Sequence, residues 1–103
     1  MEQLKEAVET EMWSGGNIHA EEVETSMMLH LHPELVRMER AVREYPQPSI
    51  EYEMSSLPMG ALSKTGVFGD ATVATAEKGS RFEAMWVECS AALWTEFLDE
   101  TAN

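Results

Sequence analysis

The chain has 103 residues, of which 19 are acidic and 7 basic, so its formal net charge is −12. This length allows one domain with a single modest core. The charge argues against nucleic acid and anionic membranes as partners, because neutralising phosphates requires clustered Lys and Arg. No segment is long and apolar enough to cross a bilayer, and the first residues lack the pattern of a signal peptide, so a cytoplasmic location is expected.

The beginning of the chain predicts a short amphipathic helix over residues 2–12, with acidic residues on its outer face. Its apolar face recurs at helical spacing and consists of Leu4, Ala7, Val8 and Met12. Trp13 then leads into Ser14-Gly15-Gly16-Asn17, where glycine permits a positive φ and a close backbone approach. We therefore expect a tight turn before His19.

A second helix is predicted from about Glu21 or Glu22 to Leu31. Acidic residues occupy its first turn, where the helix dipole favours them. Its apolar face consists of Val23, Met27, Met28 and Leu31. Pro33 ends the helix, because proline lacks a backbone donor and disfavours a helical residue before it. One or two further turns are expected over residues 34–43.

Residues 45–64 predict a long ordered loop. This segment holds three of the four prolines, and only a short alternation over residues 50–54 indicates an extended edge. Loops of this length in a compact domain usually serve a site or pack against a neighbour. The Pro-rich loop therefore indicates a contact with something outside this chain.

The last part of the chain predicts a long helix from Thr75 to about Asp99. It follows a Gly-bounded segment over residues 65–70, and Asp70 or Thr72 is a suitable N-cap. One face of this helix is apolar and consists of Phe82, Met85, Trp86, Cys89, Leu93 and Phe97. The tryptophan of this stripe is expected in the core, whereas Trp94 is a candidate anchor for a subunit contact.

Three groups of side chains suggest chemistry, and each also has a structural explanation. They are His19, the pair His30 and His32, and the carboxylates of Glu21, Glu22 and Glu24. The spaced histidines resemble a metal pair, yet residues two apart on a helix point in different directions, which favours two partly exposed side chains. The carboxylates either form a solvated helix start or take part in catalysis. The lone histidine either exchanges protons or hydrogen-bonds locally.

Two separated stretches resemble the creatininase family. Residues 19–29, together with Pro33-Glu34-Leu35-Val36, are similar to the family's His-Ala-Gly-x-x-Glu-Thr-Ser signature. Residues 66–79 are similar to its second C-terminal block, Gly-Asp-Pro followed by Ala-Ser/Thr-x-Glu-Lys-Gly. Two blocks in the right order are more specific than either block alone.

The resemblance implies an α/β fold, in which residues 1–103 form the C-terminal part of one three-layer α/β/α domain. As an isolated chain this part would be mostly helical, with a long Pro-rich loop and a long C-terminal helix. The resemblance also implies metal-dependent hydrolysis of a C–N bond in a small linear or cyclic amide, in which zinc or manganese ions activate water. The implied partner is a second copy in a homo-oligomer or an absent N-terminal half.

The resemblance assigns roles to five positions. His19 matches the family's proton-transferring histidine, which helps to activate water and protonates the leaving nitrogen. Glu24 matches the signature glutamate and is expected to orient the histidine or steady the helix start. Gly15, Gly16 and Glu21 are expected to face the substrate. Glu21 stands where the signature has glycine, and Gly15 stands where creatinine-cleaving members have tryptophan, which argues against creatinine as substrate.

The family's metal-ligand motifs, Glu-x-His-Gly and Gly-His-x-Asn/Glu, have no counterpart in this sequence. No metal ligand is therefore assigned, and the zinc or manganese cofactor would belong to the complete family enzyme. We expect this C-terminal part to be inactive alone, because general acid–base catalysis supplies only about 10²–10⁴-fold. The alternative is a small acidic binding or scaffold module derived from the family.

Overall fold

The computed structural model describes residues 2–16, 19–47 and 56–102, and these are mostly helical with one small sheet. The α-helices are α1 (Glu2–Ala7), α2 (Glu22–Leu31), α3 (Met59–Leu62) and α4 (Ala76–Thr101). The 3₁₀ turns are η1 (Trp13–Gly15), η2 (Pro33–Leu35) and η3 (Met38–Arg40), and the strands are β1 (Arg43–Glu44) and β2 (Gly69–Asp70). Among these residues no helix is both long and apolar enough to span a bilayer.

Helix α2 has the bounds that the sequence predicts. The Glu21 side chain caps it by accepting hydrogen bonds from the backbone N–H groups of Val23 and Glu24, both at 3.1 Å. This satisfies two of the donors that every helix start leaves without an intrahelical partner. The helix ends at His32, directly before Pro33. Local cap and breaker chemistry therefore suffices to define α2.

Helix α1 is shorter than predicted, because it ends at Ala7 rather than at Met12. The N–H groups of Glu9 and Thr10 donate to the Glu22 carboxylate at 3.0 Å, although that carboxylate lies 12 or 13 residues further along the chain. Backbone donors used in this way are not available to continue the helix. A tertiary contact thus sets the end of α1.

The middle of the chain alternates turns with short pairing segments. The turns predicted over residues 34–43 form as η2 and η3, both of 3₁₀ type. Strand β1 pairs antiparallel with β2, with Arg43 opposite Asp70 and Glu44 opposite Gly69. The expected Pro-rich loop contains α3, while the predicted edge over residues 50–54 lies outside the described residues.

Helix α4 begins at a cap other than the two predicted candidates. The Thr75 hydroxyl accepts from the N–H of Lys78 at 3.1 Å, whereas Asp70 closes a separate turn by accepting from the N–H of Thr72. The helix then crosses α2 at Gly79. A Cβ added at Gly79 would lie 1.9 Å from the Ser26 carbonyl oxygen, so glycine is needed for this contact.

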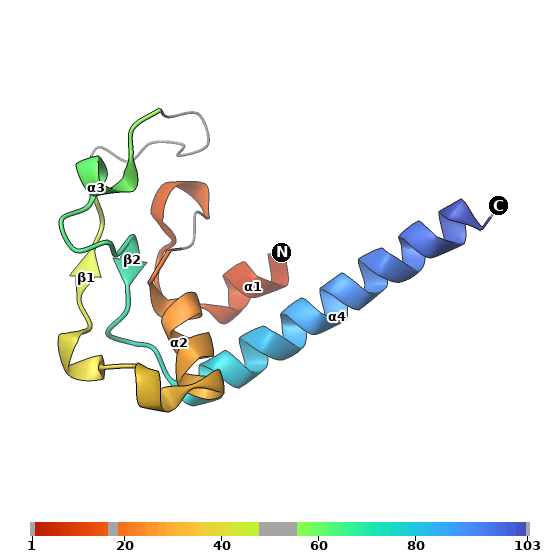
Figure 1. The fold of residues 1–103 in the computed structure, drawn as a ribbon, viewed down its shortest axis with the longest axis horizontal. Helices are drawn as coiled ribbons and strands as arrows, with labels where there is room; N and C mark the ends of the chain where they lie inside the picture. The colour runs from red at the N-terminus through yellow and green to blue at the C-terminus, as the bar shows by residue number, and fades with distance from the viewer. Residues whose placement is uncertain (1, 17–18, 48–55, 103) are drawn as a thin grey trace.

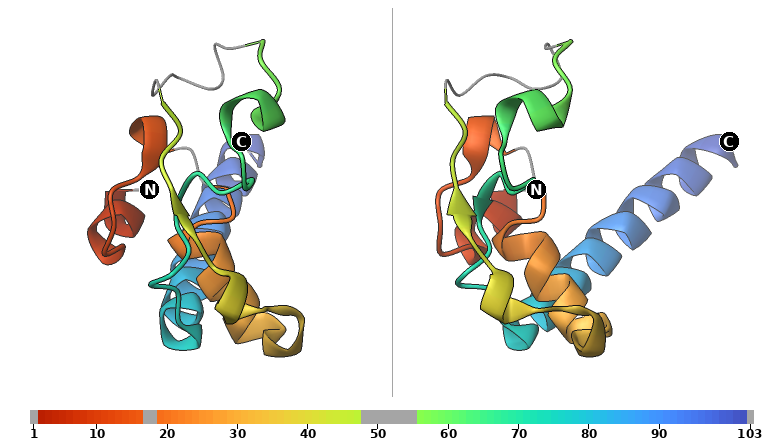
Figure 2. Two further views of the ribbon diagram at one scale, coloured as in Figure 1. Left: turned by 90° about the vertical axis from the view of Figure 1, so that its left-hand side faces the viewer. Right: turned by 60° about the vertical axis from the view of Figure 1, so that its left-hand side comes forward.

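The core lies where α1, α2 and the first turns of α4 meet, and its fully buried apolar members are Leu4, Val23 and Phe82. Trp86 packs against this core, as predicted. Beyond it α4 leaves the rest of the molecule and runs alone to the C-terminus (Figure 1), and two further views agree (Figure 2). The apolar stripe predicted as one face is therefore buried only at its beginning, and Leu93 and Phe97 are exposed.

Candidate functional site

His19 lies beside the small sheet, between the first turn and α2. Its carbonyl accepts a hydrogen bond from the N–H of Phe68 at 3.2 Å, in an antiparallel bridge next to β2. The two rings meet edge to face with centroids 5.9 Å apart. Trp13 packs against the same phenylalanine at 4.7 Å. Both the backbone and the ring of His19 are thereby positioned by residues far away in sequence.

Glu24 lies in the first turn of α2, close to His19. One carboxylate oxygen of Glu24 accepts from the N–H of Ala20 and lies 4.0 Å from Nδ1 of His19. Ala20 has a φ of 52°, in the left-handed region that is uncommon for residues other than glycine. The structure thus brings together the two positions predicted as catalytic, and Glu24 also fixes the turn between them.

An open hollow with a volume of about 370 Å³ adjoins Glu24, and His19 is not among its lining residues. Its lining comes from α2 and from the segment around η2, and consists of Ala20, Glu24, Thr25, Met28, Leu35, Val36 and Arg37. A molecule in this hollow would contact the carboxylate that lies beside His19. The hollow is therefore the candidate substrate site of the described residues.

The structure does not bring Gly15 and Gly16 to this hollow. Gly15 ends the turn η1, and Gly16 follows it with a φ of 115°, donating its N–H to the Trp13 carbonyl. Gly16 lines a different hollow with Lys5 and Met12. Asn17, between this turn and His19, lies outside the described residues.

Glu21 is buried, and its carboxylate serves as the cap of α2. Burial raises the pKa of this carboxyl above its usual value, against the opposing effect of the hydrogen bonds from Glu24 and Val23. On its other side Glu21 touches the sheet, because a Cβ added at Gly69 would lie 2.8 Å from the Glu21 Cβ. This side chain connects the start of α2 to β2.

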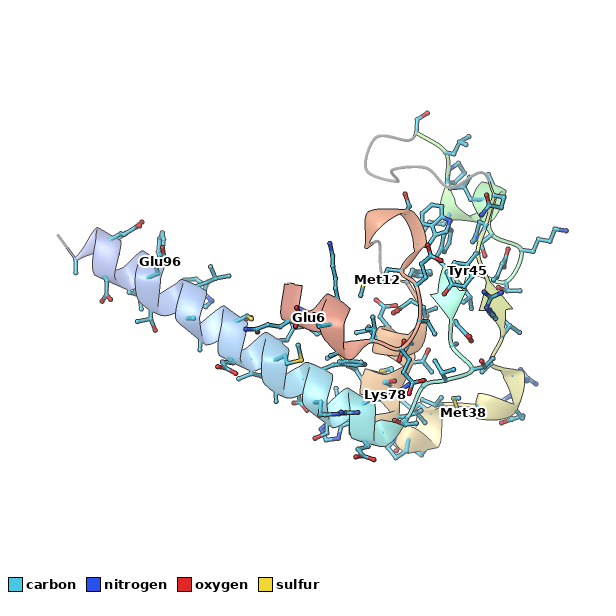
Figure 3. The ribbon with its side chains drawn as sticks, turned by 180° about the vertical axis from the view of Figure 1, so that it is seen from behind. Glu6, Met12, Met38, Tyr45, Lys78 and Glu96 are labelled. Carbon is cyan, nitrogen blue, oxygen red and sulfur yellow. The ribbon has the colours of Figure 1, made fainter. Side chains whose placement is uncertain are left out.

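A buried ion pair joins three parts of the chain, and the sequence analysis missed it. Glu22 is fully buried and accepts from Nζ of Lys78 at 2.8 Å and from Glu9 and Thr10. Burial disfavours the charge of Glu22, yet the hydrogen bonds from Lys78, Glu9 and Thr10 keep its pKa below the usual value. Lys78 also donates to the Val73 carbonyl at 2.7 Å, at the base of α4 (Figure 3).

The interpretation of residues 21–24 as a solvated acidic helix start is therefore wrong for Glu21 and Glu22, and fits only Glu24, which is exposed. One signal could have revealed the ion pair. Lys78 lies in the first turn of a helix, where the helix dipole disfavours a cation. A lysine in that position indicates a carboxylate partner from elsewhere.

His30 and His32 each contact a different carboxylate. His30 pairs with Glu83 of α4 at 2.6 Å, and His32 pairs with Glu34 at 3.0 Å. Across residues 2–16, 19–47 and 56–102, no group of three or more His, Cys, Asp or Glu side chains is arranged to hold a metal ion. These residues therefore do not provide a metal centre.

The sequence and the structure of this chain are both similar to those of creatininases. The family model described as "Creatininase: Creatinine amidohydrolase" matches residues 1–94. The mycofactocin precursor peptide peptidase of Mycobacterium tuberculosis is 46% identical over 78 residues, which are 73% of this chain and 31% of the relative. The chain thus spans about a third of the length of the curated relatives it matches.

Solved structures with this fold are likewise longer. The putative creatinine amidohydrolase of Bacteroides fragilis has a TM-score of 0.66 and 34% identity, over 89% of this chain and 37% of that protein. A manganese form of creatininase and a variant complexed with creatine each have a TM-score of 0.58 and 29% identity, over 75% of this chain and 30% of theirs. The described elements therefore match part of that fold.

Proposed function

Because this chain belongs to the creatininase family, we propose that it carries the proton-transferring part of a hydrolase that cleaves a C–N bond in an amide. The observation that supports this proposal is the placement of His19. Its ring adjoins Phe68 and lies 4.0 Å from the Glu24 carboxylate, beside the hollow of about 370 Å³. The proposed substrate is a small linear or cyclic amide or the amide bond of a peptide.

The chemistry requires a proton at the leaving nitrogen. An amine is a poor leaving group when it departs as an anion, so a side chain that gives a proton to nitrogen speeds cleavage. Imidazole suits this step, because its charge changes within the pH range of most cells. We assign the step to His19, whose side chain is half-exposed and can reach a substrate.

Glu24 is proposed as the residue that positions His19. A carboxylate near Nδ1 selects the ring orientation that presents Nε2 to the substrate. The same carboxylate accepts from the N–H of Ala20, so it also holds the backbone turn that carries the histidine. Glu21 caps α2 and does not line this hollow. Gly15 and Gly16 do not line it either, so their contact with a substrate stays a prediction.

We assign the metal of the family to residues other than those that the structure of this chain describes. Creatininase structures include a zinc form and a manganese form, and the described residues of this chain do not fit such an ion. Zinc or manganese would supply Lewis-acid activation of water in a complete enzyme. We propose that this chain contributes the proton transfer there, in a homo-oligomer or together with the remaining two-thirds of the family domain.

A chimera tests this function. The matching segment of the Mycobacterium tuberculosis peptidase, 46% identical over 78 residues, is replaced by this chain and assayed on the peptide that the relative cleaves. We expect a folded, active chimera. His19→Gln should lower kcat by about 10²–10⁴-fold, the usual contribution of a general acid or base. Glu24→Gln should lower kcat less.

His32→Gln is the matched control, because His32 is an exposed histidine whose side chain pairs with Glu34 and does not line the hollow. It should leave kcat unchanged. An active chimera whose kcat is the same with His19→Gln would refute the role of His19. A folded chimera with no activity would show that the chain cannot serve as the catalytic part of the family domain.

That last outcome would favour the alternative, an acidic binding or scaffold module. One observation supports this alternative: the end of α4 exposes Leu93, Trp94 and Phe97, which line an open hollow of about 320 Å³. Large apolar side chains in contact with water often mark an interaction surface. The site around His19 is the stronger evidence, because His19 lies 4.0 Å from Glu24, the signature residue that lines a hollow of about 370 Å³.

A further inference from the structure

The hollow beside Glu24 is lined by the cationic side chain of Arg37 as well as by the Glu24 carboxylate. Its apolar wall is formed by Met28, Leu35 and Val36, and Arg37 completes the lining. The chain has only 7 basic residues against 19 acidic ones, so a positive charge at this place is notable. Such a lining suits a ligand with an apolar body and a negatively charged group.

Arg37 is held at the hollow by turns on both sides. The N–H of Val36 donates to the Pro33 carbonyl at 3.1 Å, and the N–H of Arg40 donates to the Arg37 carbonyl at 2.9 Å. The backbone at Arg37 is thus determined before any ligand binds, which lowers the entropy lost on binding.

The guanidinium of Arg37 forms no salt bridge with any residue that the structure describes. Two other cations are paired: Arg43 lies 4.7 Å over the Tyr45 ring and 3.8 Å from Asp70, and Lys78 pairs with Glu22. An arginine presents a planar fork of donors that matches a carboxylate. The donors of Arg37 remain for a ligand.

We propose that Arg37 binds the carboxylate of the substrate, while the substrate's apolar group lies against Met28, Leu35 and Val36. The inference deepens the proposed function, on which it rests, because it names the substrate class as amides that carry a carboxylate next to an apolar group. An N-acyl amino acid and the C-terminal end of a peptide share this chemistry. Without Arg37, the net charge of −12 and Glu24 in the same hollow would repel such an anion.

The first test is a binding titration of the metal-free chain, followed by NMR. The probes are N-acetyl-leucine and its amide, N-acetyl-leucinamide, which differ in the charge of one group. We expect the acid to bind more tightly than the amide. Arg37→Gln should weaken binding of the acid about tenfold and leave the amide unchanged, because a hydrogen bond between charged groups is lost.

Arg40→Gln is the matched control, because Arg40 is an exposed arginine three residues away that does not line the hollow. It should leave both affinities unchanged. Equal affinities of the acid and the amide, or an equal loss of acid binding in the Arg37 and Arg40 variants, would overturn the proposal. Binding of neither probe would overturn it as well.

A second arm separates the two sources of the carboxylate. The tripeptide acetyl-Ala-Ala-Leu is titrated with a free and with an amidated C-terminus. If Arg37→Gln weakens binding of N-acetyl-leucine but not of the tripeptide acid, the site accepts small molecules. If it weakens binding of both acids equally, the site also accepts peptide ends. Either result supports the proposal, whereas unchanged binding of both acids would contradict it.

The chimera gives a readout that is independent of the isolated chain. There Arg37→Gln should raise KM about tenfold for a substrate that ends in a carboxylate and leave kcat unchanged, since binding alone is lost. His19→Gln should instead lower kcat. An inactive chimera combined with Arg37-dependent binding would refute the proposed hydrolysis and keep the carboxylate site, so the two failures are distinguishable.

Discussion

The two parts of α4 have the same helical pattern but opposite surroundings. The proximal part (residues 76–86) contributes the buried residues Lys78, Gly79 and Phe82. In the distal part (residues 87–101) every residue from Ser90 onward is exposed, including Leu93 at 66% and Trp94 at 64%. An amphipathic pattern therefore shows which face of a helix is apolar, and only the partner elements decide whether that face is buried.

The distal part of α4 is nevertheless a regular amphipathic segment. At about 100° per residue, Leu93, Phe97 and Trp94 share one side of the helix, and Glu88, Glu96 and Asp99 point away from it. Glu100, seven residues after Leu93, lies at the edge of the apolar side. Figure 3 places Glu96 near the free end, far from Lys78 at the base. A helix segment this short is marginal in water without packing, so its stability depends on the anchored part.

The largest effect is expected from the ion pair that anchors the proximal part. Lys78→Met should lower the free energy of unfolding by about 4 kcal/mol, because it leaves the fully buried Glu22 carboxylate without its cationic partner. Urea unfolding followed by circular dichroism measures this. Arg81→Met, at an exposed position of the same helix, should change it by less than about 0.5 kcal/mol. Equal effects of the two variants would contradict the anchoring role.

The next largest loss of stability is expected from Phe82→Ala, with Phe97 of the same helix as its control. Phe82→Ala removes a side chain that is 1% exposed and should cost about 3 kcal/mol of stability, through lost burial and the cavity that remains. Phe97→Ala, at 54% exposure, should cost less than about 0.5 kcal/mol. The same urea titrations measure both. A large loss with Phe97→Ala would show that another chain covers the distal part.

A smaller effect is expected at the helix cap. Thr75→Ala removes the hydroxyl that accepts from the N–H of Lys78 and should cost about 1 kcal/mol. Thr95 is the matched threonine in the distal part, where its hydroxyl donates to the Ala91 carbonyl. Thr95→Ala should be neutral or slightly stabilising, because alanine is the better helix former. Thermal melts of both variants would detect the difference, and its absence would argue against the cap.

Acid should lower the free energy of unfolding through Glu44, which lies in β1. Hydrogen bonds from Thr65, Lys64 and Ser63 lower the pKa of Glu44 from 4.5 to about 2. A carboxyl with a lowered pKa in the folded state stabilises the fold above its unfolded pKa. This contribution is lost as the pH falls from about 4.5 to about 2.

Urea midpoints measured between pH 6 and pH 2.5 test this expectation. Glu44→Gln should flatten the fall in stability over that range, because the titrating group is gone. A parent chain whose stability does not change below pH 4.5 would contradict the assignment.

Local sequence determined the elements whose signals lie within a few residues. A side-chain cap at Glu21 and a breaker at Pro33 define α2, and a long run of helix formers with Thr75 before it defines α4. The roles of His19 and Glu24 came instead from the resemblance of residues 19–29 to the family signature, a short motif that a linear comparison can find. The breaker at Pro33 and the helical spacing act over a few residues, so a linear reading finds them, whereas neither Glu21 nor Thr75 was predicted as a cap.

Tertiary structure alone decided the rest. The Glu22 carboxylate takes the N–H groups of Glu9 and Thr10 and so ends α1, and it is buried because Lys78, 56 residues away, neutralises it. Phe68 meets His19 across 49 residues of chain. No local pattern encodes such pairs, because the energy of a buried charge or an aromatic contact depends on which distant segment the fold brings beside it.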